Sequence, residues 1–260
     1  MTTELLRVEG LCRNFGGLAA LRNVSFSVGR GELVGLIGPN GAGKTTCFNV
    51  VSGTMPPSSG RVIFDGKDIS GGPPSRVVVA GLARTFQSTS TYPGVTVAEN
   101  VYRGLLSRLR GTTMARLTGR HEHLIDPGRV DAEVNAILDM FELQQWREVA
   151  AGSLAYGLQK KLGIAIAMAT RPSILLLDEP AAGLNHEECN ELGRLLRDLQ
   201  QRQGLTILLV EHHMALVMDL CERIVVLVQG EMIAQGTPAQ IRENPAVIEA
   251  YLGAPDYAHA

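Results

Sequence analysis

The sequence of 260 residues has no apolar run that approaches the roughly 18 residues a membrane-spanning helix needs, so we expect any membrane role to depend on a partner. Its four cysteines are scattered without C-x-x-C spacing, which argues against a disulfide or zinc framework and favours reduced thiols in a cytosolic chain. The N-terminus carries no basic segment followed by an apolar one, so we expect no secretory signal. The net charge of −2 lacks the basic excess of nucleic-acid-binding proteins, and we expect no nucleic acid partner.

The most informative stretch is Gly38–Thr46, which fits the phosphate-loop pattern G-x-x-x-x-G-K-[ST]. The apolar run before it, Glu32–Ile37, predicts a buried parallel strand, and a helix is predicted from Thr45 to Val51. Backbone N–H groups of such a loop and the helix start bind phosphate oxygens. A chance match of a glycine-rich turn is the alternative, which the strand–loop–helix context disfavours. We predict that the following residues bind a nucleoside triphosphate: Gly38, Pro39, Asn40, Gly41, Ala42, Gly43, Lys44, Thr45 and Thr46.

Two side chains of this loop have specific expected roles. Lys44 is expected to reach the β- and γ-phosphates. The Thr45 hydroxyl is expected to bind Mg²⁺.

The composition, 45% hydrophobic and 19% charged, is that of an ordinary globular protein. Short apolar or alternating segments predict strands, and segments with helical periodicity lie between them. This alternation predicts an α/β fold with a parallel sheet covered by helices. The predicted strands are Leu5–Leu11, Asn23–Val28, Arg61–Gly66, Leu82–Phe86, Ile174–Leu177, Thr206–Val210 and Ile224–Val228.

The middle of the chain turns helical, with helices predicted at Val97–Leu109, from Asp131 onward and at Gln159–Ala169. We predict one domain, residues 1–260, in which a helical subdomain (88–170) is inserted into a nucleotide-binding core (1–87 and 171–260). Six arginines between residues 101 and 130 suit either a basic arm that faces anionic lipid or a solvated loop. Two short helices are predicted after Thr237 and from Pro245, and residues 254–260 are predicted to fray.

Two adjacent carboxylates, Asp178 and Glu179, follow the run Ile174–Leu177, as in a Walker B segment. Buried carboxylates at a strand end are costly unless they meet a cation, and a phosphate-loop fold supplies one as Mg²⁺. We predict that Asp178 is the metal partner and that Glu179 takes a proton from the attacking water. The alternative is a surface Asp-Glu pair after a core strand.

His212 follows the predicted strand Thr206–Val210, at the edge where ligands bind in parallel sheets. It could donate a hydrogen bond to the γ-phosphate of a bound nucleotide. From residue type alone, a solvent-facing pair with His213 is the alternative.

Five segments stand in the order of an ATP-binding cassette (ABC) ATPase, and the chain resembles that family over nearly its whole length. They are the phosphate loop, Gln87 after Ala83–Phe86, the stretch Leu154–Gln159, Asp178-Glu179 and His212. The resemblance implies a P-loop NTPase (RecA-like) core with an antiparallel β subdomain and an inserted α-helical subdomain, and ATP and Mg²⁺ as cofactors.

The resemblance also implies roles for two isolated residues. Gln87 matches the Q-loop, which touches Mg²⁺ and the attacking water, and Phe15 sits where the family places an aromatic ring that stacks on adenine. Taken alone, Gln87 is an ordinary loop amide. An ordinary packed phenylalanine is the alternative for Phe15.

Leu154–Gln159 corresponds to the family's signature, usually Leu-Ser-Gly-Gly-Gln, which caps the γ-phosphate of ATP held by the opposite subunit. Gly157 and the helix start are kept, but Ala155 replaces the serine. One missing hydrogen bond to a charged group is worth about 1.5–3 kcal/mol, enough to weaken a closed dimer without preventing it. Asn185 replaces the D-loop aspartate of many members and can hydrogen-bond across the dimer without supplying charge. The residues that the resemblance assigns to the nucleotide of the opposite subunit are Ala155, Tyr156, Gly157, Gln159 and Asn185.

Further segments resemble one subfamily, the ATP-binding subunits of branched-chain amino acid importers that carry an insertion before the signature. They are Leu154–Gly157, Pro180–Asn185, Glu211–Met214 and the tail between Gly236 and Gly253. This resemblance implies a peripheral ATPase on the cytoplasmic face of the inner membrane. Its implied partners are membrane permease subunits, a second ATPase subunit arranged head to tail and, indirectly, a periplasmic substrate-binding protein.

Three alternatives remain open. Related importers of urea, amides or aromatic acids use similar ATPases. A soluble ABC ATPase of the translation-factor or repair type usually has two cassettes or sustained heptads, and this chain shows neither. A P-loop kinase would have an acceptor site and a lid rather than a signature loop.

Overall fold

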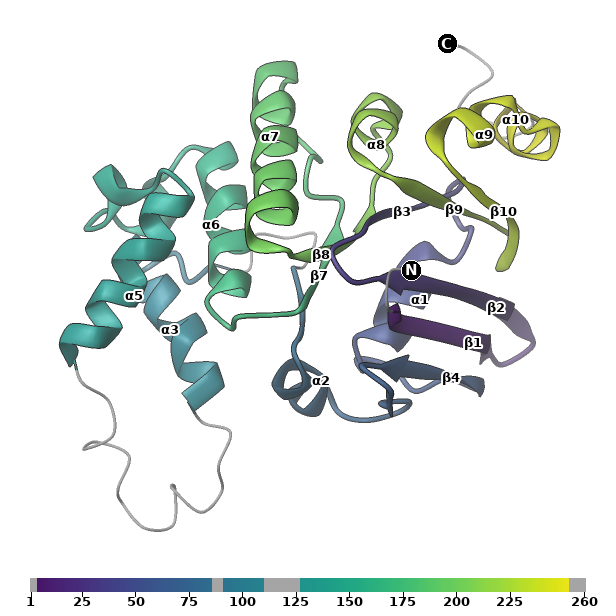
Figure 1. The fold of residues 1–260 in the computed structure, drawn as a ribbon, viewed down its shortest axis with the longest axis horizontal. Helices are drawn as coiled ribbons and strands as arrows, with labels where there is room; N and C mark the ends of the chain where they lie inside the picture. The colour runs from purple at the N-terminus through teal and green to yellow at the C-terminus, as the bar shows by residue number, and fades with distance from the viewer. Residues whose placement is uncertain (1–3, 86–90, 110–126, 253–260) are drawn as a thin grey trace.

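The computed structural model describes residues 4–85, 91–109 and 127–252 (Figure 1). A six-stranded sheet organises the fold, in the order β10-β9-β3-β8-β7-β6. All neighbouring strands in it are parallel except β10, which pairs antiparallel with β9. Its strands are β3 (Leu33–Ile37), β6 (Leu82–Arg84), β7 (Ile174–Asp178), β8 (Thr206–Val210), β9 (Arg223–Val228) and β10 (Glu231–Gly236).

Both faces of this sheet are buried, which is why its central strands read as continuous apolar runs. In β3, Leu33 and Ile37 belong to one hydrophobic cluster, whereas Val34 and Leu36 belong to another. The same alternation continues through β7 and β8, because successive side chains of a strand point to opposite faces. The sheet therefore separates two hydrophobic cores.

The first core lies between the six-stranded sheet, helix α1 (Lys44–Val51) and a four-stranded antiparallel sheet in the order β2-β1-β4-β5. In β2, Val24, Phe26 and Val28 are buried while Asn23 and Ser25 are exposed, so the predicted half-buried alternation is confirmed. The antiparallel sheet implied by the family resemblance is present. Its strands are β1 (Glu4–Phe15), β2 (Leu18–Gly29), β4 (Ser59–Phe64) and β5 (Lys67–Asp68).

The second core lies between the other face of the six-stranded sheet and the helices. Helices α7 and α8 lie along the sheet, and α3, α5 and α6 gather at one end of the molecule (Figure 1). On α5, the side chains of Val134, Leu138 and Phe141 are buried, as the predicted periodicity requires. The helices are α2 (Pro74–Ala80), α3 (Val97–Leu109), α5 (Pro127–Met140), α6 (Tyr156–Met168), α7 (His186–Gln203), α8 (Met214–Leu220), α9 (Pro238–Glu243) and α10 (Pro245–Leu252), with short 3₁₀ turns at Gln144–Trp146 and Ala151–Ser153.

Several element bounds differ from the predictions. Helix α5 begins at Pro127, four residues before the predicted Asp131, since a proline is tolerated in the first turn of a helix. Helix α6 begins at Tyr156 rather than Gln159, because Ala155 already has the extended backbone of an N-cap. Gly157 lowers helix propensity in the first turn of α6, so the sequence pattern indicates a later start.

Other differences concern strands and missed elements. Strand β6 ends at Arg84, and the predicted strand end at Phe86 lies outside the described residues. Strands β1 and β2 extend beyond the predicted segments Leu5–Leu11 and Asn23–Val28 and leave only residues 16–17 in the turn between them. Helix α2 was not predicted because its valine run has β propensity, and β10 was not predicted because it lacks an alternating pattern.

The predicted C-terminal helices are confirmed. Thr237 and Gln240 form a capping box at the start of α9, with Pro238 in its first turn, and α10 begins at Pro245. The helices between residues 97 and 168 contribute to the same hydrophobic cluster as one face of the six-stranded sheet. The predicted division into a core and an inserted subdomain stays a prediction.

Across the described ranges, none of the helices combines the length and the apolar character required to cross a bilayer. Most of the basic segment between residues 101 and 130 lies outside those ranges, as do residues 254–260. Within the segment, Arg103 lies 4.5 Å from the ring centroid of Tyr92 and pairs with Glu99 at 2.7 Å. Arg103 is thus held by its own neighbours.

Candidate functional site

Strands β3, β7 and β8 pair in parallel, so the loops that follow them meet at one edge of the sheet. A cavity of about 590 Å³ lies at this edge, and we call it the P-loop cavity. Ten of the predicted site residues line it: Phe15, Asn40, Gly41, Ala42, Gly43, Lys44, Thr45, Thr46, Glu179 and His212. Five residues that were not predicted complete the lining: Leu18, Ala19, Ala20, Arg22 and Gln229.

The loop before α1 is built around two glycines that no other residue could replace. Gly43 is the N-cap of α1 with φ +99°, and a Cβ there would lie 2.6 Å from the carbonyl oxygen of Ala20. A Cβ on Gly38 would lie 2.0 Å from the carbonyl oxygen of Leu227. No side chain caps the first turn of α1, so the loop brings a helix start into the cavity wall, as anion binding requires.

Lys44 extends beneath this loop. Its Nζ donates hydrogen bonds to the carbonyl oxygens of two predicted residues, Gly38 at 2.6 Å and Pro39 at 3.0 Å. Burial lowers the pKa of Lys44, and the nearby carboxylates of Glu179 and Asp178 oppose that shift. A buried ammonium group at this position, near the start of a helix, is suited to bind the oxygens of a polyphosphate.

Asp178 and Glu179 are neighbours in sequence but have different surroundings. Asp178 ends β7 in a buried position, and its Oδ2 lies 2.7 Å from Nη2 of Arg84. Glu179 has a left-handed backbone with φ +49°, while its N–H still donates to the carbonyl of Val210 at 2.8 Å. This turn directs Glu179 into the P-loop cavity, whereas Asp178 does not line it.

His212 lies close to Glu179, with 3.0 Å between Nε2 and Oε1. The residue before it, Glu211, is buried, and its carboxylate accepts hydrogen bonds from three backbone N–H groups, those of Ala181 (2.6 Å), His212 (3.0 Å) and His213 (3.3 Å). Glu211 therefore ties the turn after Glu179 to the turn that carries His212. The alternative of a purely solvent-facing histidine pair does not hold for His212, since its ring meets a carboxylate of the cavity.

Phe15 presents its ring to the cavity and is 43% exposed, so it is not an ordinary packed phenylalanine. The guanidinium carbon of Arg13 lies 5.0 Å from the ring centroid, which is a cation–π distance. Phe15 ends β1 next to the turn into β2, so its ring is anchored at the cavity mouth by the antiparallel sheet.

The signature residues do not line the P-loop cavity of their own chain. Ala155 is the N-cap of α6, and the ring of Tyr156 is within contact distance of Gly183. A Cβ on Gly157 would lie 2.7 Å from Oε1 of Glu188. The side chain of Gln159 donates to the carbonyl of Leu154 at 2.9 Å, which fixes the start of the helix.

Asn185 also lies away from the cavity and caps helix α7. Its Oδ1 accepts from the N–H of Glu188 at 3.0 Å, and the Glu188 carboxylate accepts from the N–H of Asn185 at 2.9 Å. These two bonds form a capping box. The carboxylate of Glu188 thus lies against both the signature start and the α7 cap.

One predicted residue, Gln87, lies outside the described residues. Conversely, the sequence reasoning missed Arg84 and Glu211, although both had a readable signal. Arg84 is a charged residue inside a predicted strand, and Glu211 is a carboxylate directly after an apolar run, the same pattern that singled out Asp178.

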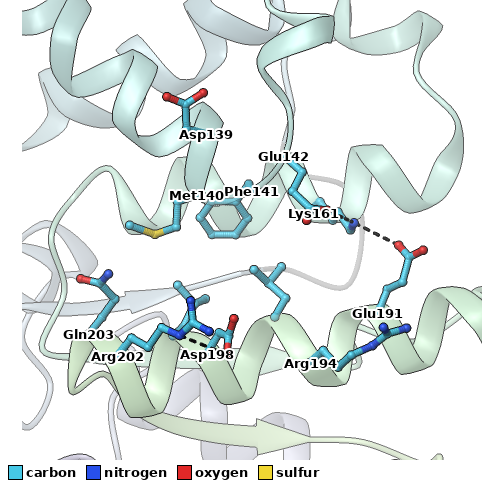
Figure 2. A pocket seen from close by; sticks show the side chains of 12 residues that line it. Asp139, Met140, Phe141, Glu142, Lys161, Glu191, Arg194, Asp198, Arg202 and Gln203 are labelled. Atoms are coloured by element: carbon cyan, nitrogen blue, oxygen red, sulfur yellow. Dashed lines mark hydrogen bonds and ion pairs between the residues drawn. The ribbon is translucent and has the colours of Figure 1, made fainter.

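A second cavity, of about 610 Å³, lies between the end of α5 and helix α7 (Figure 2). Lys161 of α6 pairs with Glu191 of α7 at 3.1 Å along its edge. The lining mixes charged side chains such as Asp198 and Arg202 with apolar ones. Among the described residues, none of the predicted site residues lines it, so the P-loop cavity is the candidate functional site.

Comparison with known proteins shows which family has a similar sequence and fold. A family model described as ABC transporter matches residues 21–182, and one described as branched-chain amino acid ATP-binding cassette transporter matches residues 231–257. The high-affinity branched-chain amino acid transport ATP-binding protein BraF of Pseudomonas aeruginosa is 42% identical, covering 97% of this chain and 99% of its own. LivG of Escherichia coli K12, described in the same terms, has the same identity and coverage. The solved structure of MJ1267, an ATP-binding cassette of an ABC transporter in its ADP conformation, superposes with a TM-score of 0.84 at 31% identity, covering 97% of this chain and all of the other.

The buried position of Cys47 on α1 gives a prediction about thiol reactivity. Burial raises the pKa of Cys47 to about 12, and the thiolate is the reactive form. We expect Cys47 of the folded protein to resist N-ethylmaleimide between pH 7 and 9, where this thiol stays protonated. Cys12, which is partly exposed, serves as the control and is expected to react first. Mass spectrometry of peptides after timed labelling measures both rates. Equal rates would contradict the burial of Cys47 on α1.

Proposed function

This chain belongs to the ABC transporter family, and we propose that it is the ATP-hydrolysing subunit of a membrane importer of branched-chain amino acids. As a member of this family it is an ATP-binding transport ATPase. The observation that carries the proposal is the P-loop cavity, where Lys44, Glu179 and His212 converge on the start of α1. The 42% identity to branched-chain amino acid transport proteins over nearly the whole chain supports the substrate class.

ATP is proposed to bind with its polyphosphate on the loop before α1 and its adenine against Phe15. Lys44, already buried among carbonyl oxygens, would hold the β- and γ-phosphates. The exposed ring at the cavity mouth offers a flat apolar surface for a base.

A Mg²⁺ ion fits the oxygen donors available here. The hydroxyl of Thr45 and the carboxylate of Asp178 are hard oxygen ligands of the kind this ion prefers, and Gln87 is proposed as a further contact. When bound, the ion would neutralise charge that develops on the phosphates. Asp178 is buried and uses one of its carboxylate oxygens in the ion pair with Arg84.

Glu179 is proposed to accept the proton of the attacking water, and His212 is proposed to hold the Glu179 carboxylate in place. The hydrogen bond between them, 3.0 Å from Nε2 to Oε1, restrains the carboxylate where it lines the cavity. With a nucleotide bound, the same imidazole is proposed to donate to the γ-phosphate. A general base of this kind contributes about 10²–10⁴-fold to the rate.

We propose that the active form is a head-to-tail dimer. The signature residues lie on the start of α6, away from the P-loop cavity of their own chain, which supports a role at the nucleotide of a partner. Ala155 supplies no hydroxyl there, and the start of α6 and the backbone at Gly157 would provide the remaining contacts. Asn185 is proposed to hydrogen-bond across the same interface.

The proposed partners are two permease subunits, a second ATPase subunit and, through the permeases, a periplasmic substrate-binding protein. The subunit would lie on the cytoplasmic face of the inner membrane, and the helical segment 88–170 would pass the closure of the dimer to the permeases. Importers of urea, amides or aromatic acids would use the same ATPase chemistry, but the relatives reported above favour branched-chain amino acids. Family membership counts against a P-loop kinase.

Glu179→Gln is expected to retain MgATP binding, to lower turnover by about 10²–10⁴-fold and to accumulate as an ATP-bound dimer. The substitution removes the base while keeping the side-chain size. Equilibrium nucleotide binding, phosphate release and light scattering measure the three properties. Glu243→Gln, an exposed position on α9, is the control and should behave as the unaltered protein. A variant that stays monomeric in saturating MgATP would count against a dimer of identical chains.

Gly157→Ala is expected to abolish most hydrolysis while leaving single-site ATP binding intact. The added Cβ would lie 2.7 Å from Oε1 of Glu188, so this carboxylate must move and its hydrogen bond from the N–H of Asn185 is disturbed. The methyl group would also cover the backbone that is proposed to meet the partner's nucleotide. Gly163→Ala on the same helix is the matched control, because a Cβ there meets no atom within 4 Å. Unchanged hydrolysis in Gly157→Ala would contradict a role for this segment in the partner's site.

The importer itself is tested by affinity capture. The tagged chain, extracted from native membranes in detergent, is expected to bring down two polytopic permeases and a second cassette ATPase, identified by mass spectrometry. Ribosomal or DNA-repair proteins in their place would overturn transport and favour the soluble class of ABC ATPase. An untagged strain shows which proteins adhere to the resin.

A further inference from the structure

A buried arginine lies directly beneath the proposed metal ligands. The side chains of Arg84 and Asp178 are only 7% and 6% exposed, and their Nη2 and Oδ2 atoms are 2.7 Å apart. Strands β6 and β7 are hydrogen-bonded neighbours with Arg84 beside Leu176, so the ion pair runs from the end of β6 to the end of β7. The pair uses one carboxylate oxygen of Asp178, which leaves the second oxygen to offer to a cation or its water.

The same guanidinium also binds helix α1. Its Nη1 donates to Oδ1 of Asn49 at 2.7 Å and to Oγ of Ser52 at 3.0 Å, and its central carbon lies 5.7 Å from the ring centroid of Phe48. Asn49 stands four residues after Thr45, so the two side chains lie on the same face of α1, one turn apart. Arg84 thus joins the helix that carries one proposed metal ligand to the strand that carries the other.

We propose that Arg84 is a positioning residue that sets Thr45 and Asp178 in register for the divalent cation that accompanies ATP, an inference that rests on the proposed function. The two ligands belong to different elements, and the guanidinium touches both elements with different nitrogen atoms of one rigid plane. Arg84 contacts the metal only through Asp178 and is therefore not a catalytic residue.

The test measures metal binding rather than turnover. Mn²⁺ replaces Mg²⁺ as the probe, the non-hydrolysable analogue AMP-PNP occupies the nucleotide site, and electron paramagnetic resonance reports free and bound Mn²⁺. Loss of a group that orients a metal ligand costs about 10–100-fold in metal affinity. We expect a loss of this size in Arg84→Met, while a fluorescent ATP analogue in excess EDTA binds as it does to the unaltered protein.

Arg84→Lys separates position from charge. Lysine keeps the positive charge but ends in a single ammonium group, which cannot reach Asn49 and Asp178 with separate nitrogens in one plane. We expect Arg84→Lys to bind Mn²⁺ as weakly as Arg84→Met. Recovery of the full affinity in Arg84→Lys would overturn positioning in favour of a simple charge effect.

Asn49→Ala provides a second, independent route that keeps residue 84 unchanged. It removes the link to α1 but retains the ion pair to Asp178, so Mn²⁺ affinity is expected to fall, and the double variant with Arg84→Met should be no weaker than Arg84→Met alone. If Arg84→Met fails to fold, this variant still decides the matter. Unaltered Mn²⁺ affinity in Asn49→Ala would overturn the proposal.

Arg223→Met is the matched control for the loss of a structural arginine. Arg223 binds Glu32 through two nitrogens, at 2.7 and 2.8 Å, and neither residue lines the P-loop cavity. We expect it to lower the melting temperature and to leave Mn²⁺ affinity unchanged. Arg84→Met with a lowered melting temperature and normal Mn²⁺ affinity would reduce Arg84 to a structural ion pair. Absence of nucleotide-dependent Mn²⁺ binding in the unaltered protein would instead overturn the proposed function.

Discussion

The structure depends on the parallel pairing of three apolar strands, β3, β8 and β7, which brings the segments that carry Lys44, Glu179 and His212 to the same edge. Burial makes isolated charges costly there, so each charged group meets a partner. Lys44 lies among carbonyl oxygens, Asp178 meets Arg84, and Glu211 accepts three backbone N–H groups. Glu179 is the exception in conformation, because a left-handed backbone turns it away from the strand and into the cavity.

That turn gives two adjacent carboxylates different surroundings. Strand alternation alone would place them on opposite faces of the sheet, but the left-handed residue also lifts Glu179 out of the sheet plane. A non-glycine residue in this region costs of order 1–3 kcal/mol, and the hydrogen bond of its N–H to Val210 and the contact with His212 offset part of that cost. Such strain is common where geometry serves chemistry.

Much of this could be predicted from the sequence, because motif and local pattern agreed. The strand before the phosphate loop, the helix after it, and the convergence of Glu179 and His212 all follow from parallel strands that end in polar residues. Arg84 and Glu211 escaped because their partners are distant in sequence and become visible only when strands pair. The roles assigned to the site residues stay predictions, and the position of Gln87 lies outside the described residues.

The two hydrophobic cores on opposite faces of the six-stranded sheet have a consequence for variation. Leu33 and Val34, and likewise Leu175 and Leu176, are neighbours in sequence that belong to different interiors, so each central strand must fit two packing environments at once. The six-stranded sheet lies between these two interiors. A substitution in a central strand therefore changes the volume of one core directly, whereas a substitution of its neighbour in sequence changes the volume of the other.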